Sequence, residues 1–204
     1  DSLRVAPELF LKRLLVGGFE RVYELNRNFR NEGLSTRHNP EFTMLEFYQA
    51  YADYKDMMEL TEELIVMLAQ EICGSLQIPC GSHNVSLERP WRRLSLIGGV
   101  AEHAGVAESE IATFDDLRAL ARKLSLKFDP GLSHAKLLVE LFEQLVEPEL
   151  IQPTFVTGYP LEVSPLARQN DTAPELVDRF ELFVGGRELA NAFSELNDPA
   201  EPRR

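Results

Sequence analysis

The chain has 204 residues, of which 44% are hydrophobic and 26% charged, and this balance is typical of a soluble globular protein with one main domain. Its formal net charge of -12 excludes broad attraction to nucleic acid, because nonspecific affinity comes mainly from Lys and Arg side chains that neutralise phosphates. Any contact with a nucleic acid must therefore be local or lie outside these residues.

The start of the chain, Asp1-Ser2-Leu3-Arg4, lacks the basic and then apolar profile of a signal peptide. No run approaches the roughly 18 to 20 apolar residues that a membrane span needs, so we expect a cytoplasmic protein. Cys73, Cys80 and His83 could form a soft-metal cluster, but three candidate ligands in one polar stretch are a weak signal. Free thiols are the expectation.

A short helix is predicted at the start, because Leu11, Leu14 and Leu15 have helical spacing and Gly17-Gly18 would end it. Pro7 suits its first helical position. The next predicted helix, Tyr54 to Ile72, would end at Gly74. Its expected apolar face consists of Met57, Leu60, Leu64, Met67 and Leu68.

Two strand-like runs, Phe19 to Glu32 and Glu41 to Tyr51, mix β-branched and aromatic residues with polar ones. The polar link between them predicts a strand, a loop and a second strand. Because residues two apart on a strand share a face, each run presents one row of functional side chains. These rows are Asn28, Arg30 and Glu32 on the first strand and Phe42, Met44, Glu46 and Tyr48 on the second.

Residues 95–150 have a helical character, with a capping box at Thr113 and Asp116, and with another helix over Lys136 to Val146. Phe180 to Val184 follows as a strand candidate, and Gly185-Gly186 can form a tight two-residue turn. The return segment, 187–196, is ambiguous. Glu188, Asn191 and Glu195 have helical spacing, whereas a regular strand would place Glu188 opposite the other two.

The first hairpin resembles motif 2 of the class II aminoacyl-tRNA synthetases, with Arg30-x-Glu32, a short loop and then the run from His38 to Tyr48, HNPEFTMLEFY. Among these enzymes it is most similar to the bacterial lysyl-tRNA synthetases. The resemblance extends to 6–13, 159–168 and 179–198. It implies an α+β fold, an antiparallel sheet flanked by helices with a helical insertion, and it favours a strand with a bulge for 187–196.

We accordingly divide the chain into a first part of the catalytic core over 1–94, a helical insertion over 95–150 and a second part of the core over 151–204. The family also has a dimer-forming motif 1, a motif 3 and an anticodon-binding OB domain, none of which is found in these residues. Because motif 3 supplies an arginine at the γ-phosphate, we do not expect full activity from this segment alone.

The sequence contains neither a Walker phosphate loop nor a Gly-x-Gly-x-x-Gly fingerprint, so ATP would need an arginine-and-sheet cradle. The resemblance implies ATP and Mg²⁺ as cofactors, L-lysine and tRNA(Lys) as substrates, and a homodimer. Amino-acid activation is attack of a carboxylate on the α-phosphate of ATP, and it needs cations that offset the developing charge.

The resemblance also assigns roles to individual residues. Arg30 would be catalytic, bridging the lysine carboxylate and the α-phosphate. ATP would be bound by Arg30, Glu32, His38 and Phe42. Lysine would be bound by Glu8, Arg30, Glu46, Tyr48, Asn191 and Glu195. Mg²⁺ would be carried by Glu181 and Glu188, because carboxylates are hard oxygen ligands.

Two alternatives remain open at this point. The lysine ligase that modifies elongation factor P is related, shares the stretch HNPEFTMLE and needs no tRNA. A synthetase-like chain without turnover could also bind a small molecule or a partner protein as a regulator.

Overall fold

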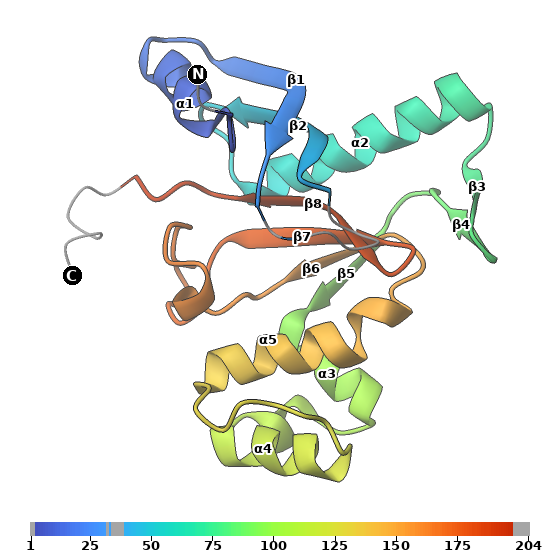
Figure 1. Cartoon of the computed structure of the whole chain (residues 1–204), viewed down its shortest axis with the longest axis vertical. Helices are drawn as coiled ribbons and strands as arrows, with labels where there is room; N and C mark the ends of the chain where they lie inside the picture. Colours follow the sequence, from blue (N-terminus) through green and yellow to red (C-terminus); the bar gives the residue numbers. More distant parts are fainter. Residues whose placement is uncertain (1–2, 32, 34–38, 198–204) are drawn as a thin grey trace. The chain divides into compact units, whose positions relative to one another are not determined.

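The computed structural model describes residues 3–31, 33 and 39–197, and Glu32 and His38 therefore lie outside the described residues. The chain forms two compact units, Asp1–Ala52 and Asp53–Arg204, and each is described by itself (Figure 1). Among the helices of the described residues, none is long and apolar enough to cross a membrane.

The first unit consists of helix α1 (Glu8–Val16) and an antiparallel hairpin of β1 (Arg21–Phe29) and β2 (Glu41–Gln49). The predicted hairpin is confirmed, and α1 contacts both of its strands. Pro7 lies just before α1 rather than at its first position. The predicted apolar stripe of α1 is reduced to Leu11, which is buried, whereas Leu14 is exposed.

The second unit begins with α2 (Tyr54–Cys73), whose predicted extent is confirmed. Asp53 caps its start, and Gly74 ends it with a left-handed φ of 64°, which glycine adopts without strain. The predicted apolar face is wrong in part: Met57 is buried, but Leu60, Met67 and Leu68 are exposed. The buried face consists of Met57, Met58, Thr61, Glu62 and Ala69.

Glu62 shows why the buried face of α2 could not be read from hydrophobicity. Its side chain is only 1% exposed, yet its carboxylate accepts a hydrogen bond from the Trp91 backbone amide at 3.0 Å. The same carboxylate lies 3.2 Å from the Arg89 guanidinium. A buried carboxylate is tolerated when it has such partners. Glu62 therefore lies on the buried face of α2 although it is charged.

A four-stranded sheet follows the order β5 (Arg92–Ser95), β6 (Thr154–Thr157), β7 (Arg179–Val184) and β8 (Arg187–Phe193). The predicted antiparallel pairing is confirmed for β6–β7–β8, but β5 pairs parallel to β6. Parallel neighbours need a long crossover, and the predicted helices supply it. The crossover contains α3 (Leu96–Ala104), α4 (Phe114–Lys123) and α5 (His134–Leu145).

The helices α3, α4 and α5 gather on the side of the sheet away from α2 (Figure 1). They share one hydrophobic core with β5, β6 and β7. The capping box predicted at Thr113 and Asp116 is confirmed at the start of α4. A separate hairpin, β3 (Gln77–Cys80) and β4 (His83–Ser86), follows α2, and Cys73 and Cys80 are exposed and form no disulfide.

Aromatic side chains occupy both faces of the sheet. On one face the Phe155 ring lies 5.7 Å from Trp91 and 5.1 Å from Phe180, centroid to centroid. On the other face Phe183 of β7 lies 5.9 Å from Phe142 of α5. Because strand side chains alternate, the residues of β7 that share a face with Phe183 point toward α5.

The predicted turn between β7 and β8 is confirmed, since Gly185 and Gly186 have φ angles of 64° and 69°. The ambiguity over 187–196 is resolved in favour of a strand over Arg187–Phe193. A register shift between Leu182 and Phe183 places Glu188 opposite Phe183 and Asn191 opposite Glu181. This bulge puts Glu188 and Asn191 on one face, although a regular strand would separate them.

Candidate functional site

Arg30 and Phe42 come together at the end of the first hairpin where the connecting loop joins β1 and β2. The Arg30 backbone amide donates to the Pro40 carbonyl at 2.9 Å, which extends the β1–β2 ladder by one step. The guanidinium carbon lies 5.2 Å from the Phe42 ring centroid, and Nε donates to the Val5 carbonyl at 3.4 Å. The predicted placement of this cation and this ring on one face agrees with the structure.

Three predicted lysine-binding residues belong to one chain of contacts in the first unit. The Glu8 carboxylate lies 2.6 Å from the Lys12 ammonium, one helical turn further along α1. That ammonium lies 5.6 Å from the centroid of the Tyr48 ring. The Tyr48 hydroxyl in turn donates to the Glu46 carboxylate at 2.8 Å. One carboxylate and an aromatic ring therefore lie beside an ammonium group, and a second carboxylate is linked to that ring through its hydroxyl.

Arg4 and Glu24 complete the polar face of this hairpin and were not predicted. Glu24 lies directly across from Glu46 in the β1–β2 register, where two like charges would repel. Arg4 forms an ion pair with Glu24 and donates from Nε to the buried Asn28 side chain at 3.2 Å. The hydrogen bond from Arg4 is the largest cause that lowers the pKa of Glu24, and the hydrogen bond from Asn26 is the second.

In the second unit, Arg179, Glu181, Glu188 and Asn191 share the face of β7 and β8 that points toward α5. The Arg179 guanidinium pairs with Glu181 and donates to the Ser164 hydroxyl. It also donates from Nε to the Asn191 side chain at 3.3 Å and lies 4.6 Å from the Tyr159 ring centroid. Arg179 thus fixes two of the predicted residues.

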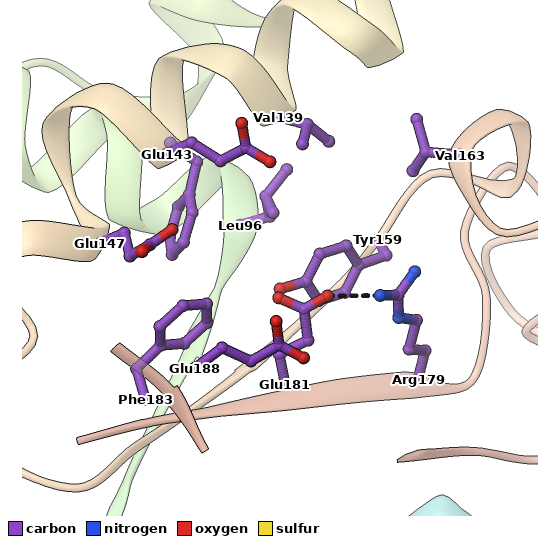
Figure 2. Close-up of a pocket in the computed structure, with 11 residues that line it drawn as sticks. Leu96, Val139, Glu143, Glu147, Tyr159, Val163, Arg179, Glu181, Phe183 and Glu188 are labelled. Carbon is purple, nitrogen blue, oxygen red and sulfur yellow. Dashed lines mark hydrogen bonds and ion pairs between the residues drawn. The ribbon is translucent and has the colours of Figure 1, made fainter. Parts of the chain in front are cut away.

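A cavity of about 250 Å³ opens between this face and α5 (Figure 2). Its acidic lining consists of Glu181 and Glu188 from the sheet, Glu143 from α5 and Glu147 from the turn after α5. The pKa of Glu188 is raised to about 7, first because its carboxyl is partly removed from water and then because the Glu181 carboxylate is near. The Glu188 side chain nevertheless keeps some exposed surface. Removal from water, followed by Glu147, also raises the pKa of Glu143.

Tyr159 lines the same cavity and is only 4% exposed. Its hydroxyl has no hydrogen-bond partner of normal geometry within the described residues. Burial, followed by the nearby Glu181 carboxylate, raises its pKa, so the phenol stays protonated and able to donate. Within the described ranges, no three Asp, Glu, His or Cys side chains are placed to hold a metal ion together.

Glu195, the last predicted residue, lies beyond β8 and forms an isolated antiparallel bridge with Ala167. The neighbouring loop is held by Arg168, whose guanidinium pairs with Asp171 at 2.8 Å and with the buried Asp178 at 3.2 Å. The predicted ATP-binding residues Glu32 and His38 fall outside the described residues, so the structure adds nothing on them.

Sequence reasoning missed Lys12, Arg179, Tyr159 and the acidic pair of Glu143 and Glu147. Two local signals could have found some of them. Arg179 and Glu181 are two apart on a strand and therefore share a face. Glu143 and Glu147 are four apart, as neighbours on a helix surface are, but such a pair more often faces solvent.

Comparison with known proteins supports a single family. A family model for tRNA synthetases class II (D, K and N) matches residues 2–204. The lysine-tRNA ligase of Chromohalobacter salexigens is 58% identical over 197 residues, covering 96% of this chain and 39% of that protein. The lysine-tRNA ligase of Carboxydothermus hydrogenoformans is 54% identical over 201 residues, covering 98% and 41%.

A third relative, the lysine-tRNA ligase of Shewanella halifaxensis, is 51% identical over 209 residues and covers 99% of this chain and 42% of its own length. The chain thus spans about two fifths of the curated relatives that it matches. Because the family model covers nearly the whole sequence, the chain belongs to the class II tRNA synthetases of the D, K and N group.

Proposed function

We propose that this chain is the part of a lysine-tRNA ligase that holds L-lysine and ATP while lysyl-adenylate forms. The observation that carries the proposal is the ammonium environment of the first unit, where Glu8 and the Tyr48 ring lie beside the Lys12 ammonium and the Tyr48 hydroxyl donates to Glu46. The related lysine-tRNA ligases, 51 to 58% identical to this chain, point to the same substrate.

The amine end of lysine would be recognised by charge and by an aromatic face. Glu8 and Glu46 would supply carboxylates, whose hydrogen bonds to an ammonium are about twice as strong as neutral ones. The Tyr48 ring would add a cation–π contact worth about 0.5 to 2 kcal/mol. In the second unit, Asn191 would bind near the lysine carboxylate, and Glu195 would bind near an amine.

The carboxylate end of lysine would be activated near Arg30. One lysine carboxylate oxygen would attack the α-phosphorus of ATP, forming a new phosphorus–oxygen bond while the bond to the bridging oxygen breaks and pyrophosphate leaves. Arg30 would hold both anions, because a planar guanidinium matches carboxylate and phosphate oxygens. Phe42 would stack on adenine, and Glu32 and His38 would lie around ATP.

Mg²⁺ would supply positive charge to the phosphates during this step. Glu181 and Glu188 suit it as hard oxygen ligands, and both line the cavity of the second unit. Arg179 would keep Glu181 oriented through their ion pair. The second step would then transfer lysine to the terminal ribose of tRNA(Lys), in a cytoplasmic homodimer.

A calorimetric titration of this chain with L-lysine, with aspartate and β-lysine as controls, tests the proposal. We expect selective binding of L-lysine, weakened at least about tenfold in Glu8→Gln because a charge-assisted contact of about 1.5 to 3 kcal/mol is lost. Glu20→Gln is the matched control, since Glu20 is an exposed carboxylate of the same unit. Its affinity should remain that of the wild type.

The outcomes separate the alternatives. Preference for β-lysine would favour the ligase that modifies elongation factor P. Binding of L-lysine without any adenylate in the presence of Mg-ATP would favour a binding protein without turnover. Absence of binding for all three ligands would contradict the proposal for this segment.

A further inference from the structure

Helix α1 turns a charged side chain toward the hairpin and leaves apolar side chains outside. Lys12 follows the buried Leu11, and its side chain is only 30% exposed. Leu9 and Phe10, by contrast, are 68% and 61% exposed. A helix that served packing alone would show the reverse pattern, because a buried polar group is the costly one. The inward position of Lys12 therefore calls for a functional explanation.

The Lys12 ammonium has the partners that the proposed function gives to a substrate amine. Its Nζ lies 2.6 Å from a Glu8 carboxylate oxygen and 5.6 Å from the centroid of the Tyr48 ring. The Tyr48 hydroxyl donates to Glu46 at 2.8 Å, so a second carboxylate is linked to the same ring. Lys12 carries the same side-chain group as free L-lysine, an ammonium with three donors on a four-carbon stem. The chain thus presents a ligand-like ammonium to its own amine-binding residues.

We propose that Lys12 is a specificity-determining residue whose ammonium occupies an amine-binding position of the lysine site and is displaced when L-lysine binds. The inference rests on the proposed function in taking Glu8 and Tyr48 as groups that bind an amine of the substrate. Its new content is that the chain itself supplies a competitor for the substrate. Displacement exchanges one ammonium–carboxylate contact for another, so the charge of Glu8 stays balanced.

The contact between Glu8 and Lys12 is weak enough to be exchanged. It joins residues four apart on one helix, and the two side chains are 43% and 30% exposed. Partly exposed ion pairs gain little net free energy, because water and salt screen them and both side chains lose conformational freedom. A bound L-lysine is held by further contacts, so its ammonium can replace that of Lys12.

Displacement makes the site selective for ligands that carry a cation. An ammonium can take over the contact with Glu8, whereas an apolar group at the same position either leaves Lys12 in place or leaves Glu8 without its partner. Both outcomes disfavour the uncharged ligand, and such repulsive elements are a common source of specificity. The apparent affinity for L-lysine is lowered in return, since only chains in which Lys12 has left the position are ready to bind.

The test compares the L-lysine affinities of variants by calorimetry at physiological ionic strength. Lys12→Met removes the ammonium but keeps an unbranched stem that suits a helix. It should bind L-lysine about two- to fivefold more tightly than the wild type, because the competing ion pair is lost. Lys12→Arg retains a cation and should bind no more tightly than the wild type. Arg13→Met is the matched control, because Arg13 is an exposed cation at the next position of α1, and its affinity should stay unchanged.

Nuclear magnetic resonance observes the displacement itself in a chain that carries ¹³C in its lysine side chains, titrated with unlabelled L-lysine. The Cε signal of Lys12 is identified by its loss in Lys12→Arg. It should shift as L-lysine binds, because the ammonium leaves the Glu8 carboxylate and the face of the Tyr48 ring. The signal of Lys123, an exposed residue of α4, should not shift.

Circular dichroism should show that all variants are folded. Equal or weaker L-lysine binding by Lys12→Met would overturn the inference and leave the proposed function intact, as would a Lys12 signal that does not respond to bound L-lysine. An equal gain in Arg13→Met would also overturn it, since net charge would then explain the effect. Absence of L-lysine binding in both the wild type and Lys12→Met would overturn the proposed function and this inference with it.

Discussion

The two units of the chain are stabilised in different ways. In Asp1–Ala52, Leu11 and Val22 are the buried large hydrophobic residues of the described part, while Tyr23 and Leu25 are 75% and 65% exposed. In Asp53–Arg204, one core joins β5, β6 and β7 to α3, α4 and α5. A two-stranded hairpin is marginal alone, whereas layered elements bury a core. The first unit therefore depends on polar contacts, and the second on packing.

The largest test of this contrast is Phe155→Ala. The Phe155 side chain is fully buried between Trp91 and Phe180. Its truncation should lower the free energy of unfolding by about 3 to 5 kcal/mol. The control, Leu25→Ala in the exposed hairpin, should change it by less than about 0.5 kcal/mol. Urea denaturation measures both, and equal losses would contradict a packed second unit and an open first one.

A smaller loss is expected when α2 loses its cap. The Asp53 carboxylate accepts hydrogen bonds from the amides of Lys55 at 2.7 Å and Asp56 at 3.2 Å. Asp53→Ala should destabilise the second unit by about 1 kcal/mol, as lost helix caps do. Glu59→Ala, at an exposed position of the same helix, serves as control in the same denaturation experiment. A loss no greater than that of the control would show that the cap is dispensable.

The next effect depends on pH and is smaller, because Glu188 keeps contact with solvent. The pKa of Glu188 is raised from 4.5 to about 7 in the folded chain. Between these values the unfolded chain releases the proton while the folded chain retains it, so ionisation of Glu188 costs stability as pH rises. The stability advantage of Glu188→Gln over the wild type should therefore grow from pH 4.5 to about 7 and then level off.

Urea midpoints of the wild type and Glu188→Gln at several pH values provide this measurement. Glu175→Gln, at an exposed position of the second unit, is the control and should track the wild type. A difference between Glu188→Gln and the wild type that does not vary with pH would show that the Glu188 carboxyl titrates normally.

The smallest change in stability is expected for Tyr48→Phe in the first unit. The variant loses the hydroxyl that donates to Glu46 at 2.8 Å, at a half-buried position. We expect stability to fall by less than about 1 kcal/mol and affinity for L-lysine to fall about fivefold. Tyr23→Phe, whose ring is 75% exposed, should alter neither quantity. Calorimetry measures the affinity for L-lysine, and an unchanged affinity in Tyr48→Phe would contradict the proposed lysine site.

The ends of α2 and the turn between β7 and β8 could be predicted because local chemistry determines them. Asp53 and Gly74 bound α2 through a cap and a left-handed residue, and Gly185-Gly186 turns the chain between two strands. These features depend on a few neighbouring residues, and the sequence displays those residues directly.

The faces of the elements were less predictable because distant residues determine them. Glu62 can be buried because the Trp91 amide and the Arg89 guanidinium, which are distant in the sequence, contact its carboxylate. The shared face of Glu188 and Asn191 depends on a bulge that no local residue pattern requires. The family resemblance supplied the candidate residues, while the contacts of Lys12 and Tyr159 needed the structure.

The parallel pairing of β5 with β6 affects the order in which the chain can fold during synthesis. β5 ends at Ser95 and its partner begins only at Thr154, so β5 leaves the ribosome long before the strand that will pair with it. The α3–α5 segment is synthesised in the interval and can form helical contacts first, because local contacts have a lower closure cost. Until β6 has been synthesised, the backbone N–H and C=O groups of β5 that pair with it lack their strand partner.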